Sequence, residues 1–310
     1  MAVPPRRRWR RWVGLLLALV LLSPVVLWLG ITGWTTWRYT HRAPPSPSPE
    51  TPVVEGATVE DLRIVTDDGV ELAAWYLQPP PGRPVFVLLH GIHGTRDWER
   101  NAFSYLRERE MGGLALSFRG HGDSGGEHRS FGWDEARDVV AAVAFLEDRA
   151  PTSPVFVRGV SLGAVAAIFA GDDLDERVDG YFLEMPFRDL ETVSRNWIRH
   201  RGYSERMADL YQAGVRFWGR FFLPVSADAI SPIREIEGLS PSATVSIIVG
   251  IDDHLVGLSD AEDLHAACPA DCELVILAGV GHESLPAAAP ERWGRALAGF
   301  LERAGVASTE

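Results

Sequence analysis

Ser161 has the sequence surroundings of a catalytic serine, because it lies in the G-V-S-L-G stretch of residues 159–163. The apolar run before it, residues 154–159, predicts a strand, and the small residues 162–170 predict a helix. Flanking glycines, here Gly159 and Gly163, permit a sharp strand-to-helix turn that pushes the serine hydroxyl outward. We therefore predict that Ser161 is a nucleophile. The alternative is a turn glycine pair beside a serine without a chemical role.

A serine hydroxyl is a weak nucleophile at neutral pH, so a histidine must accept its proton and a carboxylate must orient that histidine. The apolar run 244–250 leads into Asp252 and Asp253, and the run 273–279 leads into His282. The order serine, aspartate, histidine at successive strand ends is the order of one hydrolase architecture. His282 is the predicted base. The other histidine near these strand ends, His254, is expected to be an exposed loop residue.

The predicted elements must bring these strand ends together. Residues 62–65 and 70–77 flank an Asp-Gly turn and predict an antiparallel hairpin. Later apolar runs alternate with helical stretches such as residues 134–148 and 290–303, which predicts an α/β fold with a mostly parallel sheet of about eight strands flanked by helices. Active sites of such sheets form at the carboxyl ends of the strands.

These motifs resemble the α/β-hydrolase superfamily, in particular its extended-family serine esterases and lysophospholipase-like members with a small cap. The resemblance covers residues 58–310. It implies the α/β-hydrolase fold and assigns the acid to Asp253 rather than Asp252, because Gly250, Asp253 and Val256 match the family's G-x-x-D-x-x-V register. The stretch from Phe118 to Ser124 resembles the family's R-G-x-G-x-S loop, which braces the site.

Charge that develops on a carbonyl oxygen during acyl transfer must be stabilised by amide donors. Leu162 N–H, directly after the nucleophile, is one predicted donor. The resemblance supplies the second, since residues 90–94 match the family's H-G-x-x-G turn and place Ile92 N–H near the oxyanion. In this turn His90 and Gly91 are expected to be structural, and His93 to line the loop or pocket. No metal and no organic cofactor is implied.

An insert of about sixty residues separates two predicted strands, which is longer than an ordinary connection. Residues 187–240 are therefore expected to form a small helical cap over the site. Its apolar residues recur at helical spacing and form one aromatic-rich face (Met207, Leu210, Tyr211, Gly214, Phe217, Trp218, Phe221 and Phe222). Two interpretations stay open: the face packs as core, or it forms an acyl-chain pocket or a lid that leans on a membrane.

The N-terminal region predicts a membrane segment. Residues 13–33 carry no charge over about 30 Å of helix, which matches a bilayer core, and tryptophans flank both ends. Five arginines precede this run. The positive-inside rule then predicts a cytoplasmic tail (1–12), a single-pass signal anchor (13–37), a Pro/Ser-rich linker (38–57) and an extracytoplasmic domain (58–310). A cleaved signal peptide is the alternative.

Composition excludes several functions. All 30 basic residues are arginine, so mechanisms that use a lysine nucleophile are excluded. After residue 45 the chain holds 23 arginines against 42 carboxylates, a balance that disfavours nucleic-acid binding. Cys268 and Cys272 are the two cysteines. In an exported domain they form a candidate disulfide, with free thiols as the alternative.

Taken together, the residues predict a serine hydrolase that cleaves a carboxylic ester or thioester of a small-molecule or lipid-like substrate through an acyl-enzyme on Ser161. Acyl transfer and peptide or amide cleavage use the same triad and remain alternatives. A membrane-tethered binding module without catalysis is a third reading, because a fold does not guarantee a reaction.

Overall fold

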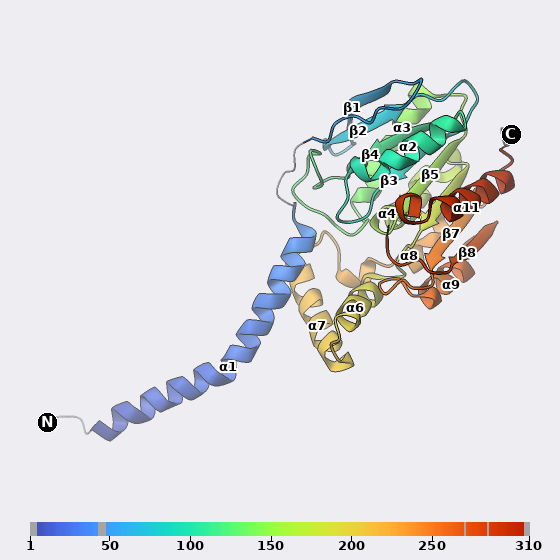
Figure 1. Cartoon of the computed structure of the whole chain (residues 1–310). Helices are drawn as coiled ribbons and strands as arrows, with labels where there is room; N and C mark the ends of the chain where they lie inside the picture. The colour runs from blue at the N-terminus through green and yellow to red at the C-terminus, as the bar shows by residue number, and fades with distance from the viewer. Residues whose placement is uncertain (1–4, 43–47, 270, 284, 307–310) are drawn as a thin grey trace.

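The computed structural model describes residues 5–42, 48–269, 271–283 and 285–306. Its centre is an eight-stranded sheet in the order β1-β2-β4-β3-β5-β6-β7-β8 (Figure 1). β1, β2 and β4 pair antiparallel, and all other neighbouring pairs are parallel. The predicted α/β fold with a mostly parallel sheet is therefore confirmed. The strands are β1 Val59–Val65, β2 Glu71–Leu77, β3 Val85–Leu89, β4 Gly112–Leu116, β5 Val155–Val160, β6 Gly180–Glu184, β7 Thr244–Gly250 and β8 Cys272–Leu277.

Helices cover both faces of this sheet. The α-helices in the described ranges are α1 Pro5–Thr40, α2 Arg100–Glu108, α3 Glu135–Arg149, α4 Leu162–Phe169, α5 Gly171–Leu174, α6 Leu190–His200, α7 Glu205–Phe222, α8 Pro232–Glu235, α9 Leu258–Ala267, α10 Leu285–Ala288 and α11 Pro290–Arg303. Residues of α3, α4 and α9 join the core on one face, and residues of α2 and α11 join the core on the other.

The central strands are apolar throughout because both of their faces are buried. In β3, Val85, Val87 and Leu89 belong to the core under α3 and α4, whereas Phe86 and Leu88 belong to the core under α2 and α11. Successive side chains of a strand point to opposite faces, so a continuous apolar run is what a doubly covered strand requires. The sheet is thus fixed from both sides, and the loops at its carboxyl edge are held on a rigid base.

The cap follows β6 and consists mainly of α6 and α7 (Figure 1). Asp189 starts α6 by accepting a hydrogen bond from the backbone N–H of Thr192 at 2.6 Å, which satisfies one of the free donors of the first turn. Gln212 in α7 donates to the Glu191 carbonyl of α6 at 2.8 Å. These contacts join the two cap helices into one antiparallel pair.

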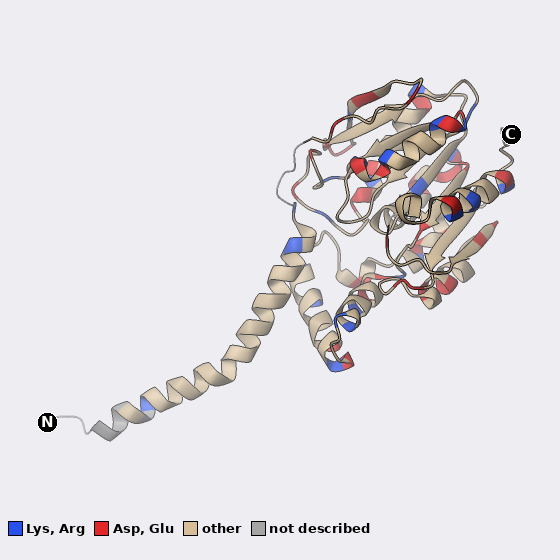
Figure 2. Ribbon diagram, viewed as in Figure 1, with Lys and Arg blue, Asp and Glu red and all other residues tan. Residues whose placement is uncertain are grey.

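Helix α1 extends far from the rest of the molecule (Figure 1). It has 36 residues, or roughly 54 Å at 1.5 Å per residue. Between Arg11 and Arg38 the helix holds no charged residue, and Figure 2 shows this stretch in tan, in contrast to the domain. Residues Arg11–Thr40 are long and apolar enough to cross a membrane, and the most apolar window holds no buried residue. A core helix of a soluble protein would be mostly buried, so this exposed surface requires another environment.

The end of α1 differs from the sequence-based expectation. The anchor was expected to end at residue 37 and to lead into a linker that spaces the domain from the bilayer. Instead, α1 continues to Thr40 and packs against α7, and Thr32, Thr35, Thr36 and Thr40 are all buried. Beyond the helix, Arg42 N–H donates to the Glu127 carbonyl at 2.9 Å. Residues 1–4 of the expected tail and 43–47 of the expected linker lie outside the described residues.

Candidate active site

Ser161 occupies a strained turn between β5 and α4, with φ 51° and ψ −108°. A left-handed φ is costly for a residue with a side chain, so the surroundings must hold it. The Ser161 N–H donates to the Glu184 carbonyl at 2.8 Å. Both motif glycines are needed for space, because a Cβ on Gly159 would come within 2.4 Å of Gly163, and a Cβ on Gly163 within 2.4 Å of the Leu89 carbonyl oxygen.

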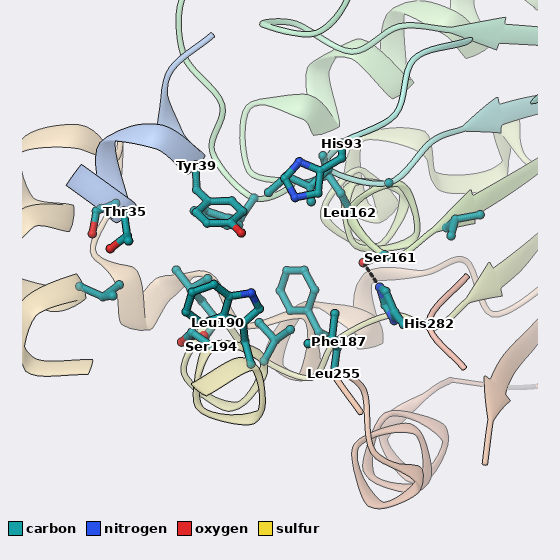
Figure 3. Close-up of a pocket in the computed structure, with 18 of the residues that line it drawn as sticks. Thr35, Tyr39, His93, Ser161, Leu162, Phe187, Leu190, Ser194, Leu255 and His282 are labelled. Atoms are coloured by element: carbon teal, nitrogen blue, oxygen red, sulfur yellow. Dashed lines mark hydrogen bonds between the residues drawn. The ribbon is translucent and has the colours of Figure 1, made fainter. Parts of the chain in front are cut away.

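Three predicted residues meet at this turn. The Ser161 hydroxyl lies 3.0 Å from His282 Nε2 (Figure 3). His282 Nδ1 lies 2.7 Å from an oxygen of Asp253. Nδ1 faces a carboxylate and therefore carries the proton, so Nε2 is free to accept the serine proton. Asp253 follows β7 and His282 follows β8, which explains how residues far apart in sequence converge at one edge of the sheet.

Asp253 is held for this task by the backbone. Its second oxygen accepts hydrogen bonds from the N–H groups of Leu255 and Val256 at 2.8 and 2.9 Å, and its side chain is fully buried. Asp252 is exposed. The structure thus brings Asp253 rather than Asp252 to the histidine. His254, expected to be a loop residue, is exposed and stacks on His200 with ring centroids 4.6 Å apart.

Hydrogen bonds of His90 fix the loop after β3. His90 Nδ1–H donates to the Gly91 carbonyl at 2.7 Å, while His90 Nε2 accepts from Phe118 N–H at 3.1 Å. Burial holds the pKa of His90 well below its usual value, so the ring stays neutral in this tautomer. Since C=O and N–H of a trans peptide point in opposite directions, a fixed Gly91 carbonyl also fixes the direction of Ile92 N–H.

The second predicted donor is Leu162 N–H, at the first turn of α4, where backbone N–H groups have no partner within the helix. Ile92 and Leu162 both line the same cavity as Ser161. His121 Nε2 contacts the Ile92 carbonyl at 2.9 Å from the other side. The loop is therefore braced by His90 and His121, and the sequence analysis missed the second brace.

The R-G-x-G-x-S stretch contributes bracing without touching the triad. The Arg119 side chain pairs with Asp138 and Asp68, both at 2.8 Å. Burial raises the pKa of Asp138 to about 7, although the arginine opposes this. The Ser124 hydroxyl accepts from Ala73 N–H at 2.9 Å and donates to a backbone carbonyl. These bonds tie the loop after β4 to β2.

Comparisons with known proteins agree with this geometry. A family model described as serine aminopeptidase, S33, matches residues 80–211. An esterase from Pyrococcus furiosus superimposes on 85% of this chain and 98% of its own, with a TM-score of 0.70 and 21% identity. The chain therefore has the α/β-hydrolase fold. The family match includes Ser161 but ends before Asp253 and His282, so their assignment rests on their positions in the structure.

Two curated relatives show how much of this chain is matched by a similar protein. An uncharacterised protein from Mycobacterium tuberculosis is 26% identical over 258 residues, covering 80% of the hydrolase and 81% of the relative. A lysophosphatidylserine lipase from Xenopus tropicalis is 28% identical over 178 residues, covering 56% of the hydrolase and 44% of the lipase. The likeness thus extends across most of the chain in the first case and about half in the second.

A cavity of about 730 Å³ opens beside Ser161. This is the size of a site that encloses a small organic ligand. Its walls are mainly apolar and come from the domain, from both cap helices and from α1 (Figure 3). On α7, Tyr211 and Val215 face this cavity, whereas Gly214 and Trp218 contact α1. The aromatic face of the cap is therefore divided between a pocket wall and a helix contact.

Sequence reasoning missed a buried ionic cluster next to the turn that holds Ser161. Arg158 in β5 pairs with Glu184 at 2.6 Å and with Glu99, and all three side chains are buried. Trp293 Nε1 donates to Glu184 at 2.8 Å. Burial raises the pKa of Glu99. A charged residue inside each of two otherwise apolar strands was the signal that could have indicated this cluster.

The two cysteines of the hydrolase are free thiols, so the candidate disulfide is not formed in this structure. Cys268 ends α9 and Cys272 begins β8. The hydrogen bond that the Cys272 thiol donates to Cys268, together with burial, raises the pKa of Cys272. A thiol that resists ionisation is a poor nucleophile.

Proposed function

We propose that the chain is a serine hydrolase of carboxylic esters, including thioesters, with Ser161 as nucleophile, His282 as general base and acid, and Asp253 as the group that orients the imidazole. The observation that carries the proposal is the continuous hydrogen-bond chain from Ser161 through His282 to Asp253 on the wall of an apolar cavity. A histidine that already holds the correct tautomer can act without rearrangement.

The reaction follows from these positions. The Ser161 oxygen attacks the ester carbonyl carbon while His282 Nε2 takes the serine proton, and Asp253 stabilises the imidazolium. Ile92 N–H and Leu162 N–H bind the negative oxygen of the tetrahedral intermediate. His282 then protonates the leaving alcohol or thiol as its bond to the acyl carbon breaks. Water, deprotonated by the same histidine, releases the acid from Ser161.

Amide cleavage is a second candidate, because the matching family model is described as a serine aminopeptidase. An aminopeptidase must bind the ammonium group of its substrate, for which a buried carboxylate is suited. Among the described residues that line the cavity, the acidic one is Glu283, and it is exposed. The apolar lining supports an ester over a peptide. Acyl transfer would use the same acyl-enzyme with an alcohol in place of water.

We also propose that α1 is an uncleaved single-pass anchor with a cytoplasmic N-terminus and an extracytoplasmic hydrolase domain. Five arginines precede the apolar run, which favours this orientation. The buried threonines at the end of α1 support retention of the helix. Cleavage of a signal peptide after the apolar run would cut within or beside this packed segment and expose the α7 surface that it covers.

The test is labelling of the full-length protein in non-ionic detergent with a fluorophosphonate probe, with Ser161→Ala as the control. We expect labelling of the wild type and none of the variant. Turnover of p-nitrophenyl butyrate should likewise depend on Ser161 and exceed that of the matching p-nitroanilide. A wild type that is folded but unlabelled, or labelling that persists in Ser161→Ala, would refute the hydrolase mechanism.

A further inference from the structure

The end of the anchor helix forms part of the candidate active-site cavity. Thr35, Thr36 and Tyr39 of α1 line the same space as Ser161 and His282. In Figure 3, Thr35 and Tyr39 lie at the opposite end of the cavity from Ser161 and His282. The cavity therefore runs from the nucleophile to the helix that is suited to enter a membrane.

This wall is built into the fold by close packing of α1 on α7. A Cβ on Gly33 would lie 2.7 Å from the Trp218 ring, and a Cβ on Gly214 would lie 2.5 Å from Thr32, so only glycine fits at either place. Trp218 Nε1 also donates to the Leu29 carbonyl at 3.0 Å. Small residues let helix backbones approach closely, and the indole bond fixes their register.

Tyr39 joins α1 to both other parts of the cavity wall. The centroid of its ring lies 5.6 Å from that of His93, which follows Ile92 in the loop after β3. It lies 6.5 Å from the ring centroid of Phe131. On the cap side it meets Trp197 of α6 edge-on at 6.4 Å. One side chain of the anchor thus contacts the domain and the cap at once, which makes α1 a structural component of the pocket.

The α1 end of the cavity is suited to an apolar chain. The Thr35 hydroxyl donates to the Ile31 carbonyl at 2.9 Å and the Thr36 hydroxyl to the Thr32 carbonyl at 2.8 Å, so both are already occupied by their own helix. No arginine occurs among the described residues that line the cavity. A phosphate or carboxylate head group would find no arginine partner there, whereas a hydrocarbon chain has no hydrogen bond or charge interaction with water to lose.

The outer surface at this end is also apolar. On α7, Met207, Leu210, Phe217 and Phe221 are exposed, and Phe221 is 67% accessible. They lie on the helix that packs against α1, and Ile31, Trp34 and Trp37 of α1 are exposed as well. Large apolar side chains gathered beside a membrane-spanning helix mark a surface that contacts lipid.

We infer that the substrate is a membrane lipid ester with a long unbranched acyl chain, and that α1 forms the end wall of the acyl-chain site through Thr35, Thr36 and Tyr39. This inference rests on the proposed function, because Ser161 must attack the ester carbonyl for the acyl chain to extend toward α1. The anchor then determines chain-length preference in addition to location.

A photoreactive probe tests the geometry in the unaltered full-length protein. A fluorophosphonate with an alkyl chain that ends in a diazirine bonds to the Ser161 oxygen with loss of fluoride, which leaves the chain in the acyl site. After illumination, peptide mass spectrometry should find a tetradecyl probe linked to the α1 segment around Thr35–Tyr39, and a butyl probe linked only to loops near Ser161.

The outcomes separate the two proposals. Attachment of both probes to Ser161 with no cross-link to α1 from the long chain overturns the acyl-site inference and leaves the hydrolase intact. If neither probe attaches to Ser161, the proposed function itself is refuted. A long-chain cross-link that appears on exposed α7 positions instead of α1 also contradicts the inference, because the chain would then leave the cavity.

A plug variant gives a kinetic test with a matched control. Thr35→Phe adds an aromatic ring at the end wall, whereas Ile31→Phe adds the same ring on the exposed side of α1, away from the cavity. We expect Thr35→Phe to lower kcat/KM for p-nitrophenyl dodecanoate at least about tenfold and to leave the butyrate within about twofold, since losing room for methylenes costs this much. Ile31→Phe should change neither substrate. Equal loss for both esters in Thr35→Phe would contradict the inference.

Discussion

At the scale of single residues, the carboxylate of Asp253 has two separate tasks. One oxygen accepts from the backbone N–H groups of Leu255 and Val256, and the other accepts from His282. Two N–H donors require an acceptor at the first position. When an amide replaces the carboxylate, the oxygen that faces His282 is therefore the atom replaced by an NH2 group, which donates instead of accepting.

Asp253→Asn should consequently fail through the wrong histidine tautomer. The amide oxygen stays on the two backbone donors, and the NH2 group then donates to His282 Nδ1, which moves the ring proton to Nε2. A protonated Nε2 cannot take the proton of Ser161, so kcat should fall about 10³- to 10⁴-fold. Steady-state turnover of p-nitrophenyl butyrate measures this. Asp252→Asn is the matched control and should keep activity near that of the wild type.

The candidate site residues were predictable because chemistry limits where they can stand. Ser161, Asp253 and His282 each follow a predicted strand, and the family register separated Asp253 from Asp252. Tyr39 and Thr35 were not predictable in the same way, because their role depends on which helix packs against the end of α1. Threonines at 32, 36 and 40, four residues apart within an apolar helix, were the signal for a buried face.

At the scale of elements, strand β5 leads into the strained turn of Ser161 and also carries a buried charged residue, Arg158. Arg158 sits between Glu99 and Glu184, and the Glu184 carbonyl also accepts from Ser161 N–H. The cluster therefore links β5, β6 and the turn before α2, next to the turn of Ser161. A buried ion pair adds little net stability when complete, but its disruption leaves an uncompensated charge.

Arg158→Met should lower the free energy of unfolding by about 3–5 kcal/mol, because two buried carboxylates lose their partner. Urea unfolding of the full-length protein in non-ionic micelles, followed by tryptophan fluorescence, measures this change. The control is Arg177→Met, which removes the exposed pair with Glu147 and should cost about 0–1 kcal/mol. Similar midpoints for the two variants would contradict the assigned role of the cluster.

The elements themselves followed from simple patterns, with one exception. The apolar runs around residues 85–89 and 244–250 predicted doubly covered strands, and both are strands buried on both faces. Helix α1 continues to Thr40, three residues past the predicted end of the anchor at residue 37, and this end packs on α7. Hydropathy alone does not distinguish a helix surface that meets lipid from one that meets another apolar helix such as α7.

At the scale of the whole molecule, the distribution of charge separates α1 from the acidic domain (Figure 2). Translocation of the domain with retention of the arginine-rich N-terminus is the predicted orientation. Alkaline phosphatase fused after residue 310 folds only outside the cytoplasm, so this fusion should be active in a bacterial host. A fluorescent protein that matures only in the cytoplasm, fused at the same position, should not fluoresce. The reverse pattern would show that the domain faces inward.

The packing of Gly33 and Gly214 has a kinetic consequence. Because α1 packs directly on α7 at these two glycines, the proposed anchor would hold the mouth of the cavity at one height above the bilayer midplane. A substrate dissolved in the same leaflet then reaches Ser161 by lateral diffusion in two dimensions. The rate of hydrolysis should follow the mole fraction of substrate in the surface, so that inert lipid dilutes the reaction even when the bulk concentration is constant.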